Sequence, residues 1–232
     1  MKEKTGRRGA LRAAFPATVP VLTGYGCLGL AYGLLMAAGG YGPLWSTLMS
    51  AVGFGGSMQY AAAPLLASGS FDPLQVFLLT LMVNARHIFY GLSMLERYKG
   101  LGRARLLLVY TLSDETFSLV STLDPPEGVS RRDFFLCISL LNYSYWVAAT
   151  ALGGVLGNLL AFNTRGLEFA LTALFAVLFL EQWKHRENRR SGGLGLACAA
   201  LSLAVFGPER LVIPAMVLIL AALLGGRKLT WL

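Results

Sequence analysis

Residues 72–97 read DPLQVFLLTLMVNARHIFYGLSMLER, and this stretch decides the class of the fold. Its apolar run is about as long as the ~20 residues that an α-helix needs to cross a bilayer. Asp72 and Pro73 are typical of a helix start, because Asp can accept hydrogen bonds from the first free N–H groups and Pro is preset for the first turn. The stretch therefore predicts a membrane-crossing helix.

Three polar residues, Asn84, Arg86 and His87, lie inside this apolar run. Asn84 and His87 are three positions apart, so a continuous helix places them on one face, with Arg86 pointing away. An ionisable side chain at that depth costs several kcal/mol unless it is paired or faces a cavity. The hypothesis that follows is a functional site, and polar contacts that merely hold helices together are the alternative.

The composition agrees with a multi-span membrane protein. Of 232 residues, 55% are hydrophobic and 14% charged, and the mean hydropathy is +0.58, which excludes an ordinary soluble domain. The net charge of +8 comes from short basic clusters between apolar runs, so it indicates orientation in a membrane, and nucleic-acid binding is not expected. Cys27, Cys137 and Cys198 have no ligand spacing, so no metal, cofactor or disulfide is predicted.

The remaining apolar runs predict further spans. Plain spans are expected over 13–38, 134–160, 167–182, 192–206 and 211–224. The basic segment 1–12 should be cytoplasmic, and spans that continue to the C-terminus argue against a secretory signal. Gly24, Gly26, Gly29 and Gly33 should form a smooth face for close helix packing in the first span.

Two apolar segments, 43–67 and 106–123, make poor continuous helices. The first contains GFGGSMQ at 53–59, followed by Pro64. The second contains SDET at 113–116, whose adjacent carboxylates cannot face lipid. Broken helices at membrane depth are tolerated where they line a cavity, and there they often form binding sites.

The basic clusters give an independent argument about these two segments. Clusters at 1–12, 97–105, 131–132, 184–190 and 227–228 should share the cytoplasmic side. That requires 43–67 and 106–123 to dip into the membrane and return. The predicted fold is thus one all-α transmembrane domain over 1–232, with about six full crossings, two re-entrant segments and both termini cytoplasmic. The two span-plus-dip units raise the hypothesis of an internal inverted repeat.

The polar groups of three segments suit a zwitterionic substrate. The predicted substrate-binding residues are Gly55, Gly56, Ser57, Gln59, Asn84, Asp114 and Thr116. Backbone N–H groups at the glycines could hold a carboxylate, and Asp114 or Glu115 an ammonium group. Proton coupling or charge pairing is assigned to Arg86, His87, Asp114 and Glu115, with His87 as the natural proton carrier.

Four blocks of this sequence also resemble a known family. GSMQYAA at 56–62, NARHIFYGLS at 84–93, SDETF at 113–117 and FALTALFAVLFLEQW at 169–183 look like recurrent blocks of the AzlC family. The resemblance runs from about residue 15 to the C-terminus. It implies a branched-chain amino-acid permease of the cytoplasmic membrane, with exporters of valine-like substrates among its members and a small AzlD-type membrane subunit as partner. Met58 and Ser113 depart from the residues expected there, which leaves the substrate open.

Two alternatives to transport are an intramembrane serine protease and a non-transporting scaffold. Ser57 and His87 could form the dyad of an intramembrane serine protease, but no glycine follows the serine as it does in rhomboid-like proteases. A non-transporting scaffold would leave the acidic pair at 114–115 without a purpose. The chain carries no phosphate-binding loop of the Gly-x-x-x-x-Gly-Lys-Ser/Thr type, so secondary transport is favoured and enzymatic activity is not expected.

Overall fold

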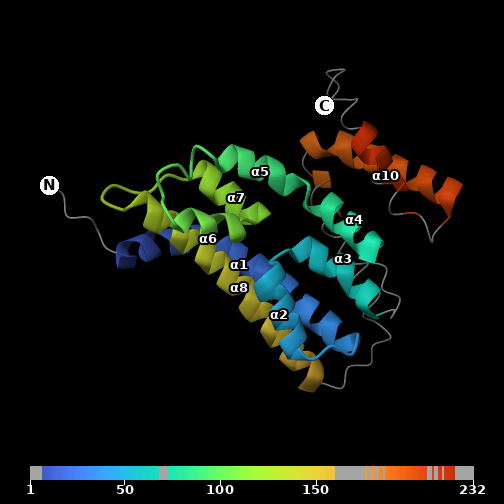
Figure 1. Cartoon of the computed structure of the whole chain (residues 1–232), viewed down its shortest axis with the longest axis horizontal. Helices are drawn as coiled ribbons and strands as arrows, with labels where there is room; N and C mark the ends of the chain where they lie inside the picture. Colours follow the sequence, from blue (N-terminus) through green and yellow to red (C-terminus); the bar gives the residue numbers. More distant parts are fainter. Residues whose placement is uncertain are drawn as a thin grey trace. The chain divides into compact units, whose positions relative to one another are not determined.

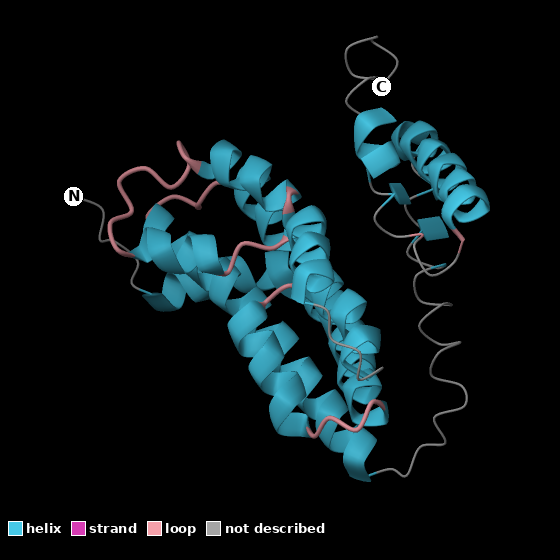
Figure 2. Ribbon diagram, turned by 45° about the vertical axis from the view of Figure 1, so that its right-hand side comes forward, coloured by secondary structure: helices cyan, strands magenta, loops and turns pink. Residues whose placement is uncertain are grey.

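A computed structural model describes residues 7–67, 73–159, 176, 179–180, 183–184, 186–207, 211, 214–215 and 217–222. The chain divides into two compact units, Met1–Phe162 and Asn163–Leu232. Every regular element among the described residues is a helix (Figures 1 and 2). The first unit contains α1 (Arg7–Ala38), α2 (Pro43–Gly53), α3 (Gly56–Ala67), α4 (Pro73–Asn84), α5 (Arg86–Met94), α6 (Ala104–Tyr110), α7 (Asp114–Thr122) and α8 (Arg131–Leu159), and the second contains α10 (Arg186–Phe206).

The two long helices α1 and α8 form the axis of the first unit (Figure 1). Their backbones meet at glycines: a Cβ atom built on Gly33 would lie 2.4 Å from the Gly154 nitrogen, and one built on Gly29 would lie 2.6 Å from the Ala149 Cβ. Ala14, near the start of α1, clusters with Phe134 at the start of α8, so the helices run parallel. Close packing through small residues is confirmed for Gly29 and Gly33.

Gly24 and Gly26 do not take part in this packing, because a Cβ atom on either would meet nothing within 4 Å. Only two of the four glycines predicted to form a smooth packing face, Gly29 and Gly33, therefore pack against α8.

The segment 43–67 is a helical hairpin, as predicted. Helix α2 ends at Gly53 and is followed by Phe54, whose φ of 37° is left-handed, and α3 begins at Gly56. The hydroxyl of Tyr41, just before α2, donates to the carbonyl of Leu66 at the end of α3 (2.9 Å). Both ends of the hairpin therefore lie together, beside the end of α1.

The segment 106–123 is a second hairpin, open at the opposite end of α1. Helices α6 and α7 are separated by residues 111–113. Arg97, in the turn before α6, donates to the carbonyls of Val120 (2.9 Å) and Leu123 (2.6 Å) at the end of α7. Thus the second predicted interruption is also confirmed, and this hairpin too returns to the end from which it starts.

The helix predicted over 72–97 is present as one candidate span over Val76–Met94, with an irregular turn at Ala85. Helix α4 ends at Asn84 and α5 starts at Arg86, joined by Ala85, whose backbone stays right-handed (φ −53°, ψ −32°). The first turn of α5 closes with a tighter bond from the Ile88 N–H to the Ala85 carbonyl (3.2 Å). This irregular turn falls between Asn84 and His87.

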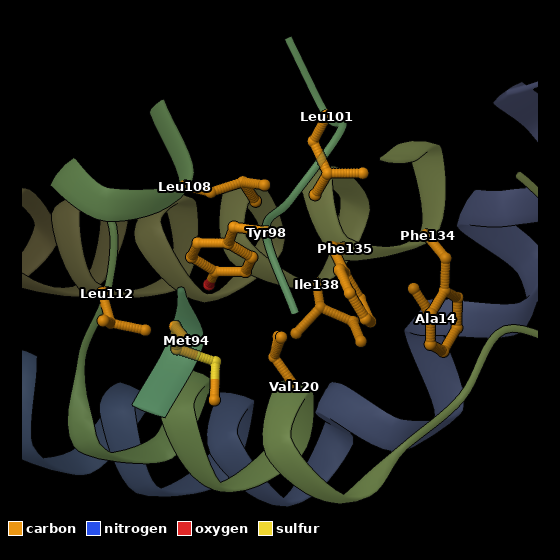
Figure 3. Close-up of a cluster of buried hydrophobic side chains, with 10 residues drawn as sticks. All are labelled: Ala14, Met94, Tyr98, Leu101, Leu108, Leu112, Val120, Phe134, Phe135 and Ile138. Atoms are coloured by element: carbon orange, nitrogen blue, oxygen red, sulfur yellow. The ribbon is translucent and has the colours of Figure 1, made fainter. Parts of the chain in front are cut away.

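A buried apolar cluster joins the ends of five helices (Figure 3). Its members are Ala14, Met94, Tyr98, Leu101, Leu108, Leu112, Val120, Phe134, Phe135 and Ile138. Because Met94 at the end of α5 belongs to the same cluster as Ala14 near the start of α1, the α4–α5 element runs antiparallel to α1. The cluster fills the space at the open end of the second hairpin with apolar side chains.

Three helical stretches of the described residues are long and apolar enough to cross a membrane: Arg7–Ala38, Val76–Met94 and Arg131–Leu159. The six crossings and the inverted repeat therefore remain predictions, and the predicted spans 167–182 and 211–224 lie largely outside the described residues. Two boundaries differ from expectation. Helix α1 already begins at Arg7, inside the basic segment, and α10 begins at Arg186, so the cluster at 184–190 is not a loop throughout.

Candidate functional site

The tips of the two hairpins meet beside α8. The Tyr110 hydroxyl, at the end of α6, contacts the carbonyl oxygens of Ala51 and Val52 at the end of α2, the latter at 3.0 Å. Tyr143 of α8 donates to the same Ala51 carbonyl at 2.8 Å. The last carbonyls of a helix have no partner within it, so these hydroxyls stabilise the break after α2.

Arg86 joins the three interrupted elements. Its guanidinium makes an ion pair of 2.7 Å with the Asp114 carboxylate, at the start of α7, and donates a 3.0 Å hydrogen bond to Ser57 Oγ, at the start of α3. Arg86 itself is the first residue of α5. The side chains of Arg86 and Asp114 are 40% and 37% exposed, so the pair borders an accessible region.

Four buried atoms of α5, α7 and α8 have no hydrogen-bonding partner within the described residues: Arg86 Nε, His87 Nδ1, Asp114 Oδ1 and Asn142 Oδ1. Buried polar atoms are nearly always satisfied, so each such atom needs an explanation. Arg86 Nε is thus a free hydrogen-bond donor on a cation, and Asp114 Oδ1 is a free acceptor on an anion.

The two half-helices α3 and α7 differ at their N-termini. In α7, Ser113 caps the helix by accepting from the Thr116 N–H at 3.2 Å, and Asp114 and Glu115 add negative charge to the first turn. In α3 the first turn holds no acidic residue, and its first backbone hydrogen bond runs from Gln59 N–H to the Gly55 carbonyl (2.8 Å). The N–H groups of Gly56, Ser57 and Met58 therefore lack an acceptor within the helix and can attract an anion.

A chain of polar side chains runs from α1 through α7 to α8. Tyr25 donates to Glu115 Oε2 at 2.5 Å and lies 2.8 Å from Ser113 Oγ. Asn142 donates to Thr116 Oγ1 at 3.0 Å, and Ser113 donates to the same oxygen at 3.1 Å. Glu115 is half-buried, and Thr116 and Asn142 are fully buried.

The predicted residues divide into those that meet at Arg86 and those that support the site. Ser57 and Asp114 meet at Arg86. Gln59 is 4% exposed and bonds at both ends of its amide, donating to Ser50 Oγ and accepting from Trp146 Nε1 (both 2.8 Å). Gln59 and the buried Thr116 thus position the two breaks. No hydrogen bond in the described part of the chain joins Asn84 to this cluster.

Sequence reasoning missed Tyr25, Asn142 and Trp146. Asn142 and Trp146 lie in NYSYW at 142–146, a polar and aromatic interruption of an apolar span that could have marked α8. Tyr25 had no local signal, because its partner Glu115 is distant in sequence.

The protease alternative finds no support in this geometry. Ser57 Oγ accepts from Arg86, whose guanidinium cannot act as a general base because it stays protonated. The His87 ring packs edge-on against Tyr90, with ring centroids 5.5 Å apart. Among the described residues no hydrogen bond joins Ser57 to His87.

Comparisons with known proteins agree on one family. The model of the AzlC protein family matches residues 20–160. The branched-chain amino acid transport protein AzlC of Bacillus subtilis is 44% identical over 94% of this chain and 86% of its own length. An uncharacterized membrane protein of Helicobacter pylori is 40% identical, covering 94% and 96%, and the inner membrane protein YgaZ of Escherichia coli is 28% identical, covering 70% and 67%. No solved structure matches significantly.

Proposed function

Because the chain belongs to the AzlC family, we propose that it is a secondary transporter that exports branched-chain, valine-like amino acids in exchange for protons. The substrate class is supported by the B. subtilis relative, which is named a branched-chain amino acid transport protein. The observation that carries the proposal is the partly open Arg86–Asp114 ion pair at the meeting point of three broken helices.

In this proposal the substrate exchanges with the internal ion pair. The carboxylate of the amino acid binds Arg86 and the free N–H groups of Gly56 and Ser57, and its ammonium group binds Asp114. A zwitterion supplies one charge of each sign, so both ends of the opened pair regain a partner. Leaving either charge buried and unpaired would be strongly unfavourable.

The aliphatic side chain requires an apolar wall. The sequence suggested Phe54, Met58 and Phe89 for it. Phe54 is buried against Tyr143 (ring centroids 5.0 Å apart) and Phe89 is 64% exposed, so Met58, next to Ser57, is the best placed of the three. Tyr90, stacked on Phe117 at 4.4 Å, provides a further apolar surface on α5.

The two hairpins suit alternating access. They enter from opposite ends of α1 and meet at their tips, so movement of one tip opens the site to one side only. Half-helices that meet near the bilayer midplane form the binding sites of many secondary transporters. We place both termini in the cytoplasm from the positions of the basic clusters, and we expect a small AzlD-type subunit in the cytoplasmic membrane as partner.

A flux assay tests the proposal. Proteoliposomes with the chain and an AzlD-type subunit should move labelled valine, and an imposed pH gradient should raise the net flux. Asp114→Asn should lower the flux tenfold or more, whereas Glu96→Gln, at an exposed carboxylate, serves as the matched control. Movement of an unrelated solute without valine, leucine or isoleucine would refute the substrate class, and flux that ignores the pH gradient would refute the coupling.

A further inference from the structure

The neighbouring carboxylates Asp114 and Glu115 have different partners. Asp114 is paired with Arg86, whereas no Lys, Arg or His lies within ion-pair distance of Glu115 in the part of the chain that the structure describes. Glu115 instead accepts a 2.5 Å hydrogen bond from the Tyr25 hydroxyl. A carboxylate held by a neutral donor can take up a proton without leaving a cation unpaired.

The Tyr25 hydroxyl has a second acceptor within reach. Ser113 Oγ lies 2.8 Å from it, and this oxygen accepts from the Thr116 N–H and donates to Thr116 Oγ1. A hydroxyl has one hydrogen and two lone pairs, so Ser113 can accept one more hydrogen bond. That bond is available to Tyr25 whenever Tyr25 does not donate to Glu115.

We propose that Glu115 takes up and releases the coupled proton, and that Tyr25 is a positioning residue that turns its hydroxyl between Glu115 and Ser113. This inference rests on the proposed function. When a proton from water forms a bond to Glu115 Oε2, the carboxylate loses its charge and donates to the Tyr25 oxygen, and Tyr25 donates to Ser113. On release that O–H bond breaks, the proton returns to water, and Tyr25 donates to Glu115 again.

Both protonation states leave these buried groups hydrogen-bonded. An unsatisfied buried donor or acceptor costs about 1–3 kcal/mol, and the switch of Tyr25 avoids that cost. The chain continues through Thr116 to Asn142 on α8, which is fully buried and has a free acceptor at Oδ1 within the described residues. Protonation of Glu115 therefore changes the contact between α1 and α7, and this contact is linked to α8 through Thr116.

The groups that face Glu115 are consistent with this role. They are Tyr25 from α1, Tyr90 from α5, which also faces Arg86, and Asp114 on α7, while the nearby residue of α8 is the neutral Asn142. Since Arg86 and Asp114 compensate each other, the proton on Glu115 sets the net charge. His87 is the rival carrier, but its contact is with the Tyr90 ring, and no hydrogen-bonded chain leads from it in the described residues.

Two assays on the same proteoliposomes test this assignment. Exchange of labelled for unlabelled valine at equal pH needs no net proton movement, whereas net flux under a pH gradient does. Glu115→Gln should retain exchange and lose the increase driven by the gradient. Tyr25→Phe keeps the ring packed against Trp146 (5.2 Å between centroids) but removes the hydroxyl that changes partners, and should retain exchange while lowering the increase driven by the gradient.

The outcomes separate this inference from the proposed function. Absence of valine exchange in the unsubstituted protein would refute the function. Gradient-driven flux that persists in Glu115→Gln but disappears in His87→Ala would refute the inference and leave the function intact. If Glu115→Gln does not fold, Glu115→Asp with infrared spectroscopy decides: the carboxylic-acid band that appears on acidification should shift in Glu115→Asp and not in Glu96→Gln, and an unshifted band overturns the assignment.

Discussion

Arg86 and Asp114 form a 2.7 Å ion pair between the first residue of α5 and the first residue of α7. The second arm of the same guanidinium binds Ser57 at the start of α3. One side chain thus connects three helix starts, each of which follows a break. Its charge and its forked geometry both matter, because a lysine has no planar pair of donors.

The first prediction concerns this pair. Arg86→Gln and Asp114→Asn should each lower the initial rate of valine flux tenfold or more, since a hydrogen bond to a charged group contributes about 1.5–3 kcal/mol and ~1.4 kcal/mol is tenfold. The double variant should lose less than the two single losses combined. The exposed pair of Lys99 and Glu96 (3.7 Å) provides the control: neutralising either residue should leave flux unchanged. Independent, additive losses at Arg86 and Asp114 would contradict a functional pair.

The second prediction concerns the α1–α8 crossing. In Gly33→Ala the new methyl group would lie 2.4 Å from the Gly154 nitrogen and 2.4 Å from the Thr150 oxygen. Both atoms are backbone, so the helices must separate, at a cost of roughly 1–3 kcal/mol. The thermal midpoint in detergent should fall. Gly26→Ala, where nothing lies within 4 Å, should leave it unchanged or raise it slightly; equal effects of the two substitutions would argue against this crossing.

The third prediction concerns the support of the first hairpin. Trp146→Phe removes the donor to Gln59 Oε1 in a buried site, at a cost of about 1–3 kcal/mol. Thermal stability should fall. Adding Gln59→Met should recover part of the loss, because the buried amide oxygen of Gln59 that had lost its donor is then absent. Trp45→Phe, at a tryptophan that is 58% exposed, is the matched control. A melting temperature as high in Trp146→Phe as in the control would show that the hydrogen bond adds nothing.

The fourth prediction concerns topology. With the native cysteines replaced, Gly42→Cys lies at the open end of the first hairpin and Lys99→Cys at the open end of the second. An impermeant thiol reagent applied to intact cells should label position 42 and reach position 99 only after the cells are opened. Labelling of both positions in intact cells would contradict hairpins that enter from opposite sides, and the reverse pattern would invert the proposed orientation.

Local chemistry was enough to locate the two hairpins and the charged residue between them. Glycines at 53–56 weaken a helix wherever they occur, and a carboxylate pair in an apolar segment cannot face lipid in any fold. An arginine within a span must find a partner for the same reason. These properties belong to the residues themselves, so the sequence alone determined the membrane class, the interruptions of 43–67 and 106–123 and the need of Arg86 for a partner.

The partners of those residues were decided by tertiary structure. The sequence could not choose between Asp114 and Glu115 as the partner of Arg86, because adjacent residues at a helix start point in different directions, and that choice depends on how α5 and α7 pack. Nor could it place Tyr25 against Glu115, since their contact requires α1 to lie beside α7. The break at Ala85 was equally hidden, because no glycine or proline marks it and its backbone remains right-handed. Long-range packing brought together residues that local sequence patterns could identify only one by one.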